Sequence, residues 1–73
     1  MTEGTTPIEI RLTGELGTWE VQLVGGGNMH LKAHSYTRQQ DAYVFVALAE
    51  GSPRYEVELA RIPVTLVQRI RGG

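Results

Sequence analysis

Apolar and polar residues alternate along most of this 73-residue chain, and this period of two constrains its fold more than any other feature. Strict alternation is typical of a β-strand with one buried face and one solvated face. One further segment, residues 43–49, is apolar at nearly every position, which predicts a central strand covered on both faces. We therefore expect five strands, at residues 8–12, 19–23, 29–36, 43–49 and 55–59.

Glycine, proline and short polar runs separate these segments. Residues 14–17 contain two glycines, so the first two strands are expected to form a hairpin. Residues 50–53 end in a proline, which cannot donate to a ladder, and should connect the central strand to residues 55–59 in a second hairpin. Three glycines at residues 25–27 predict a loop, because glycine loses the most conformational freedom when it is ordered.

Two segments allow more than one interpretation. In residues 29–36 the alternation favours a strand whose polar face carries His30, Lys32, His34 and Tyr36, although a short helix capped by Asn28 is the alternative. In residues 62–70 the apolar side chains also fall on one helical face, and Pro63 suits the first turn of a helix. The β-branched residues there prefer a strand. For this second segment we favour a short helix.

Together these elements predict an all-β protein. It is expected to be a small five-stranded antiparallel meander, or an SH3-like or OB-like barrel, with a short C-terminal helix. The predicted domain organisation is a disordered tail at residues 1–6, a single small β domain at residues 7–70 and a flexible Arg-Gly-Gly tail at residues 71–73. A domain of this size buries only about 60% of the surface of its unfolded chain.

Composition and charge narrow the function. The chain has no cysteine and a net charge of −1, which argues against a thiolate metal site and against a strongly basic nucleic-acid binder. It has no apolar run near the ~20 residues of a membrane helix and no signal-peptide pattern, so we expect a cytoplasmic protein without membrane association. Acidic residues dominate the first twenty positions, whereas Arg61, Arg69 and Arg71 have no acid among the last thirteen. This asymmetry predicts either salt bridges between the two ends or a basic surface for an acidic partner.

The sequence contains no convincing catalytic or metal-binding pattern. On a strand His30 and His34 would lie about 13 Å apart and could not share one metal. Ser35 follows His34 directly, and neighbouring strand residues point to opposite faces. We therefore predict a non-enzymatic protein without a cofactor, a metal or catalytic residues.

Aromatic residues could instead form a platform for single-stranded nucleic acid, beside Lys32, Arg38 and Arg54. The competing interpretation is that Trp19 and Phe45 fill the core and the tyrosines border it. The platform is a lesser alternative because the chain carries a net negative charge. The aromatic residues in question are Trp19, Tyr36, Tyr43, Phe45 and Tyr55.

A small binding or accessory domain that acts through protein–protein contacts is the function that we predict from the residues. A partner protein is expected, and an exposed edge strand could also support a homo-oligomer. The candidate binding residues are His30, Lys32, His34, Tyr36 and Arg38.

The last ten residues, from Val64 to Arg71-Gly72-Gly73, resemble the last strand and tail of ubiquitin-like proteins. This resemblance implies an α+β ubiquitin-like β-grasp fold and a modifier or sulfur carrier that is activated at its Gly-Gly end. Gly73 would then carry the reaction, Gly72 would allow access, and Arg69 and Arg71 would steer the activating enzyme. The family's central helix would have to come from residues 28–39.

Overall fold

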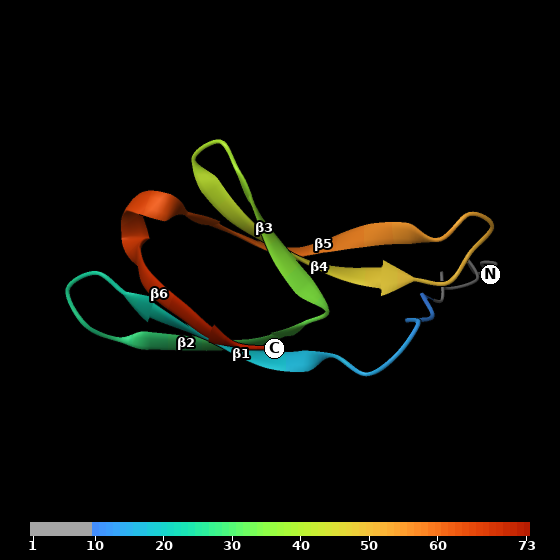
Figure 1. Ribbon diagram of the computed structural model, residues 1–73, viewed down its shortest axis with the longest axis horizontal. Coiled ribbons are helices and arrows are strands. Elements are labelled where there is room, and N and C mark those ends of the chain that lie inside the picture. The colour runs from blue at the N-terminus through green and yellow to red at the C-terminus, as the bar shows by residue number, and fades with distance from the viewer. Residues whose placement is uncertain (1–9) are drawn as a thin grey trace, which may run out of the picture.

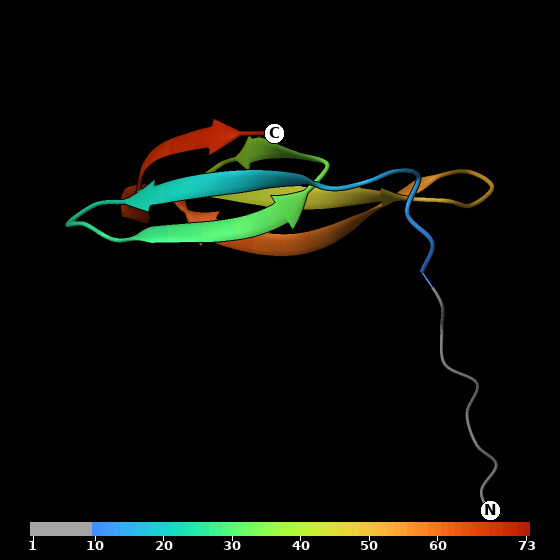
Figure 2. The same ribbon diagram turned by 90° about the horizontal axis from the view of Figure 1, so that it is seen from below.

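The computed structural model describes residues 10–73, which form two three-stranded antiparallel sheets that face each other (Figures 1 and 2). The first sheet has the order β2-β1-β6 and consists of β1 (Gly17–Leu23), β2 (Asn28–Ala33) and β6 (Val67–Gly72). The second has the order β3-β4-β5 and consists of β3 (Ser35–Gln39), β4 (Ala42–Ala49) and β5 (Tyr55–Pro63). The prediction of a mainly β protein is confirmed. The predicted tail at residues 1–6 lies outside the described residues.

The chain crosses between the two sheets without a long connection at two places (Figure 1). His34 alone separates β2 from β3, so these two strands are one bent strand that pairs with β1 before the bend and with β4 after it. A three-residue 3-10 turn, η1 (Val64–Leu66), separates β5 from β6. The two crossings fix how the two sheets stack.

β4 is the central strand of its sheet, as the unbroken apolar run predicted. Six of its eight residues are buried, and it pairs with β3 on one side and with β5 on the other. Its hairpin with β5 was also predicted correctly. Phe45 is fully buried between the sheets. Val44, which points the opposite way, is 1% exposed and pairs with Thr37 of β3 and Arg61 of β5.

The hydrophobic core lies between the sheets and draws on both of them. Val21 of β1, Ala33 of β2, Phe45 of β4 and Ile62 of β5 form its buried centre. Further apolar residues pack around this centre: Trp19, Leu23, Leu31, Tyr43, Ala60, Val67 and Ile70. These partly buried residues make up the larger share of the core, as expected for a domain with a high ratio of surface to volume.

The predicted C-terminal helix is wrong. Only Val64–Leu66 form a single 3-10 turn, and the chain then continues as β6. The physical reason is that β2 occupies only one edge of β1. The other edge forms a ladder with β6, which supplies hydrogen-bond partners to the backbone of β6 while Ile70 packs on the core. β-branched residues at Val64 and Thr65 also favour the extended form. Arg71 and Gly72, predicted to belong to a flexible tail, are part of this strand.

The β-grasp alternative is also wrong. Residues 28–39 form β2 and β3, and residues 10–73 contain no α-helix to serve as the central helix of that fold. The predicted first hairpin, between residues 8–12 and 19–23, does not form within the described residues either. Leu12 bridges Ala49, and the Thr13 amide donates to the Leu48 carbonyl over 3.0 Å. Both edges of β1 are already occupied by β2 and β6, so this segment pairs with the end of β4 instead.

Replacing Val21 by alanine is expected to lower the free energy of unfolding by about 2–3 kcal/mol, because two buried methyl groups are lost and a cavity remains. Val24 offers a matched control, since it is 61% exposed whereas Val21 is fully buried. Val24→Ala should change the stability by no more than ~0.5 kcal/mol. Urea unfolding followed by circular dichroism measures both. Equal losses in the two variants would contradict the core described above.

Candidate functional site

The outer face of the β2-β1-β6 sheet gathers three of the seven Lys and Arg side chains, which lie far apart in the sequence. Along these strands the inward positions belong to the core, as at Val21 and Ile70, so the alternating positions point outward. The register of the sheet aligns the outward residues of β2 and β6 on either side of β1. We call this surface the basic face, and it carries His30 and Lys32 of β2, Glu20 of β1, and Arg69 and Arg71 of β6.

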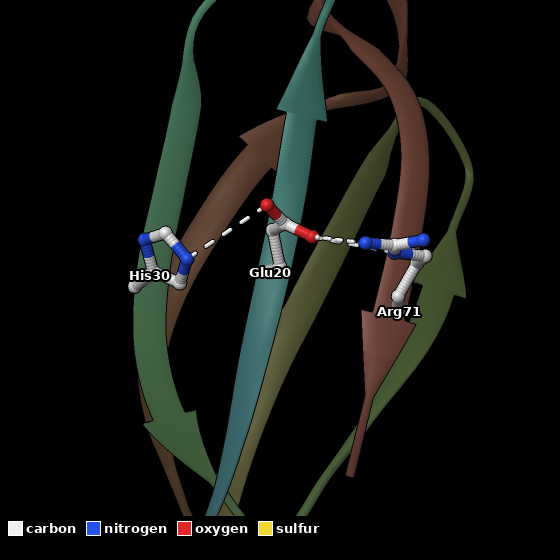
Figure 3. A network of polar contacts seen from close by, with 3 residues as sticks. All are labelled: Glu20, His30 and Arg71. Carbon is white, nitrogen blue, oxygen red and sulfur yellow. Dashed lines mark hydrogen bonds and ion pairs between the residues drawn. The ribbon is translucent and has the colours of Figure 1, made fainter.

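Glu20 lies at the centre of the basic face between His30 and Arg71 (Figure 3). Its carboxylate accepts hydrogen bonds from Arg71 Nη2 at 3.0 Å and Nε at 3.3 Å. The other carboxylate oxygen lies 3.8 Å from His30 Nε2. The ion pair of Glu20 with Arg71 is one salt bridge of the kind expected between the two ends of the chain. Because the pair is largely exposed, it contributes little to stability and mainly orients the two side chains.

The cations of the basic face outnumber its carboxylates. Three Lys or Arg side chains against Glu20 alone give the face a formal charge of +2, whereas the whole chain carries −1. Within residues 10–73 neither Lys32 nor Arg69 forms an ion pair. Both side chains are exposed and are not committed to any described residue. The basic face is thus a local positive surface on a chain of weakly negative net charge.

The outer face of the other sheet has the opposite character. Glu56 and Glu58 of β5 point outward there, beside Arg61. Arg61 donates to the Glu58 carboxylate over 3.0 Å and to Gln39 Oε1 over 3.4 Å, so it crosses above β4. The hydrogen bond between Arg61 and Glu58 lowers the pKa of Glu58 and raises the pKa of Arg61. The two sheets therefore carry charges of different sign on their outer surfaces.

The predicted binding residues do not share one surface. His30 and Lys32 lie on the basic face, but the bend at His34 reverses which residues point inward. Tyr36 follows the bend and contacts Phe45 between the sheets, with ring centroids 5.3 Å apart. Arg38, two residues further on, has the same orientation. The prediction that His30, Lys32, His34 and Tyr36 share one face is wrong, and no glycine or proline near residue 34 signals the bend.

His34 is half-buried and holds the bend with both ring nitrogens. Nδ1 lies 2.7 Å from the backbone nitrogen of Leu48, and Nε2 lies 3.1 Å from the carbonyl oxygen of Gly14. A backbone N–H can only donate, so Nδ1 accepts and the proton resides on Nε2, which donates to Gly14. The imidazole therefore joins the bent strand, β4 and the segment that precedes β1. This role occupies the histidine and removes it from the candidate binding residues.

Replacing His34 by alanine is expected to cost about 1–3 kcal/mol of folding free energy, because the partly buried Leu48 N–H loses its acceptor. His30 is the matched control, as its side chain is 63% exposed and lies 3.8 Å from the Glu20 carboxylate. His30→Ala should stay within ~0.5 kcal/mol of the wild type. Chemical denaturation compares the two. A small loss at His34 together with protection of the Leu48 amide from hydrogen exchange would contradict this role.

Four of the five aromatic residues, Trp19, Tyr36, Tyr43 and Phe45, cluster between the sheets, whereas Tyr55 is 46% exposed at the start of β5. Trp19 meets Tyr36 edge to face with centroids 5.1 Å apart, and it also contacts Phe45. Tyr43 packs against Tyr36 at 5.9 Å. The indole nitrogen of Trp19 donates to the Ala33 carbonyl over 3.0 Å, directly before the bend. The cluster therefore helps to hold the two sheets together, and Tyr36 remains 37% exposed at its rim.

Gly72 and Gly73 pack against β1, and this packing explains why glycine occupies both positions. Gly72 pairs with Trp19 and has a φ of 111°, and a Cβ at this position would overlap the Thr18 carbonyl oxygen. A Cβ at Gly73 would stand 3.0 Å from the Trp19 ring. Gly17 is constrained from the other side, because its Cβ would overlap the Gly73 carbonyl carbon. Glycine is thus required by close backbone packing at this corner.

Replacing Gly72 by alanine is expected to destabilise the fold by about 1–3 kcal/mol, through the unfavourable φ and the contact with Thr18. Gly14→Ala is the control, since nothing lies within 4 Å of a Cβ placed there. That variant should be neutral or gain up to ~1 kcal/mol from the lower entropy of its unfolded chain. Thermal unfolding reports both values. If Gly72→Ala were as stable as Gly14→Ala, the glycine would not be required by packing.

The part of the chain that the structure describes shows no pocket and no group of three metal-ligating side chains. It also holds no helix that is long and apolar enough to cross a membrane. Comparison with known proteins finds no matching family model, no matching curated protein and no matching solved structure. The geometry of residues 10–73 therefore carries the functional argument on its own.

Proposed function

We propose that this protein is a small non-enzymatic binding domain that docks an acidic segment of a partner protein on its basic face. The carrying observation is the alignment of His30, Lys32, Arg69 and Arg71 around one carboxylate by the register of the β2-β1-β6 sheet. Opposite charges on two surfaces accelerate their encounter and disfavour wrong partners. Lys32 and Arg69, without ion pairs among residues 10–73, would meet the partner's carboxylates.

An acidic protein fits the basic face better than single-stranded nucleic acid. Nucleic-acid platforms place aromatic rings among the cations so that bases can stack. Here Trp19, Tyr36 and Phe45 contact one another between the sheets, on the opposite side of β1 from the basic face. Glu20 at the centre of the face would also repel a phosphate backbone. A protein segment can instead place a donor beside Glu20 and carboxylates beside Lys32 and Arg69.

The proposed scaffold is a small, partly open barrel of the SH3-like class. If β2 and β3 count as one bent strand, there are five strands. The first four pair in sequence order, and the last, β6, pairs with the first strand and not with β5. This order supports an SH3-like barrel over an OB-like one, because an OB-like barrel needs a Greek-key crossing. A simple meander would leave β6 beside β5 instead of beside β1.

The ubiquitin-like modifier is the less supported candidate. Its fold needs a central helix where residues 28–39 form two strands. Gly72 and Gly73, which that mechanism would use, lie against Thr18 and Trp19. The packing of these glycines on β1 accounts for them without a conjugation reaction, and Arg71 binds Glu20.

The basic face is tested with an unstructured Glu-rich peptide titrated into the protein at low salt and followed by amide chemical shifts. We expect shifts on β2, β1 and β6. Lys32→Glu combined with Arg69→Glu should weaken binding at least about tenfold, which corresponds to ~1.4 kcal/mol. Raising the salt should weaken the wild-type complex, because both partners are exposed to solvent.

Two controls sharpen this test. Arg11→Glu combined with Arg54→Glu changes the net charge equally. Arg54 lies in the β4–β5 loop, and the Arg11 carbonyl accepts a hydrogen bond from the Glu50 amide of the same loop, so neither lies on the basic face. This variant should bind the peptide within about twofold of the wild type. An oligothymidylate of equal charge serves as the second control. Tighter binding of the oligonucleotide would replace the proposal by the nucleic-acid alternative, and no binding of either probe would refute it.

A further inference from the structure

We propose that the acidic segment of the partner binds as an added antiparallel strand on the free edge of β2. This inference rests on the proposed function and specifies the partner further, as an extended segment in which acidic and apolar residues alternate. β2 pairs with β1 on one side only and forms one border of its sheet (Figure 3). An unpaired strand edge presents backbone donors and acceptors to which an extended peptide can add.

The hydrogen bonds of β1 show which of its residues bond to β2. The Gly73 amide donates to the Thr18 carbonyl over 3.2 Å, so Thr18 directs its backbone groups toward β6. Successive residues of a strand direct these groups to opposite sides, and Trp19 therefore bonds to β2. Leu23 has the same orientation, because its amide donates to the Gly27 carbonyl in the turn that leads to β2.

On β2 the residues that face the free edge are two of those that form the basic face. Leu31 stands opposite Trp19 and bonds to β1, so the backbone groups of its neighbours His30 and Lys32 point to the free edge. In the described part of the chain, no backbone hydrogen bond outside the regular ladders engages either residue. His30 and Lys32 thus offer a partner both main-chain hydrogen bonds and polar side chains on the outer face.

This arrangement dictates the residue pattern of the added strand. In an antiparallel pair, residues that stand directly opposite each other share one face of the sheet. Partner residues opposite His30 and Lys32 therefore lie on the outer face, where a carboxylate meets the Lys32 ammonium. The residues between and beyond them lie on the inner side beside Leu31, which is partly buried, and Met29, which is 37% exposed. A segment that alternates Glu or Asp with Val, Ile or Leu satisfies both faces.

The free edges of β5 and β6 suit an acidic strand less well. β5 carries Glu56 and Glu58 on its outer face, and these carboxylates would repel it. At β6, Arg71 already binds Glu20, and a register shift interrupts the ladder with β1. The ladder between β2 and β1 has no shift over its six pairs. A lysine on an edge strand disfavours pairing with a strand of like charge, so Lys32 selects an acidic one.

Strand addition also ranks the cations of the basic face. The added strand lies about 4.8 Å from β2 and about three such spacings from β6. Its carboxylates therefore meet Lys32 directly, and Arg69 is reached only by partner residues outside the strand. With a short peptide at ~150 mM salt, Lys32→Glu should weaken binding at least about tenfold, and Arg69→Glu by no more than about threefold.

N-methylated peptides test the main-chain hydrogen bonds. Three short capped peptides that alternate Glu and Val are titrated into the full chain: one unmodified, one methylated at the Glu amides and one methylated at the Val amides. Only the Glu amides face β2, because Glu stands opposite His30 and Lys32. Methylation of the Glu amides should weaken binding at least about tenfold, and methylation of the Val amides should change it by no more than about twofold. All three peptides carry the same charge.

Hydrogen exchange and one matched pair of variants give a second measurement on the protein itself. The unmodified peptide should slow exchange of the His30 and Lys32 amides, because both face the free edge. His30→Pro lacks one of these amides, and proline is tolerated in an edge strand where its nitrogen faces solvent. This variant should bind about fivefold more weakly than His30→Ala, which loses the same imidazole but keeps the amide. Circular dichroism establishes that both variants are folded.

The outcomes separate this inference from the proposed function. Binding that does not distinguish the two methylated peptides would overturn strand addition and leave the proposed function intact. If no acidic peptide bound at all, the proposed function would fail, and strand addition with it. A second copy of this chain is the competing occupant of the edge. If the mean mass of the chain alone rose with concentration and the same two amides were protected without peptide, a second copy would replace the partner protein as the occupant.

Discussion

The bend at His34 is the constraint on which the rest of the structure depends. At this single residue one strand leaves the sheet of β1 and joins the sheet of β4. A strand that changes partners would leave the Leu48 amide without a backbone acceptor, and the imidazole supplies one while it donates to Gly14. Trp19 secures the same corner through the Ala33 carbonyl. Two side chains thus replace the ladder where it breaks.

The bend also separates two chemistries that lie close together in the sequence. Before it, His30 and Lys32 point outward. After it, Tyr36 points inward and joins Trp19 and Phe45. Cations therefore collect on one outer surface while aromatic rings stabilise the contact between the sheets. The proposal of an acidic protein rather than a nucleic acid as partner rests on this separation.

The sequence predicted an element of this protein correctly where residues close in the sequence determine it, and wrongly where a distant strand determines it. The central strand β4 was predicted because its apolar run needs cover on both faces, whatever its neighbours are. The end of the chain was predicted wrongly, because Val64–Ile70 fit a helix and a strand about equally well. The open edge of β1 decided between them, and no local pattern reveals that edge. Of the basic face, His30 and Lys32 were predicted to share one face of a strand, as they do, whereas Arg69 and Arg71 join it only through the register on β1.

The sequence by itself determined that this chain is a small β protein, because alternation with a period of two gives each strand one apolar and one polar face. It also determined which charges were available. Only the tertiary structure decided which strands became neighbours, and with that which charges met. Pairing joins residues 51 positions apart, as with Glu20 and Arg71, and the bend at His34 reverses the orientation of the side chains that follow it. Both effects depend on which backbone edges remain free, a property of the assembled sheets and not of any segment alone.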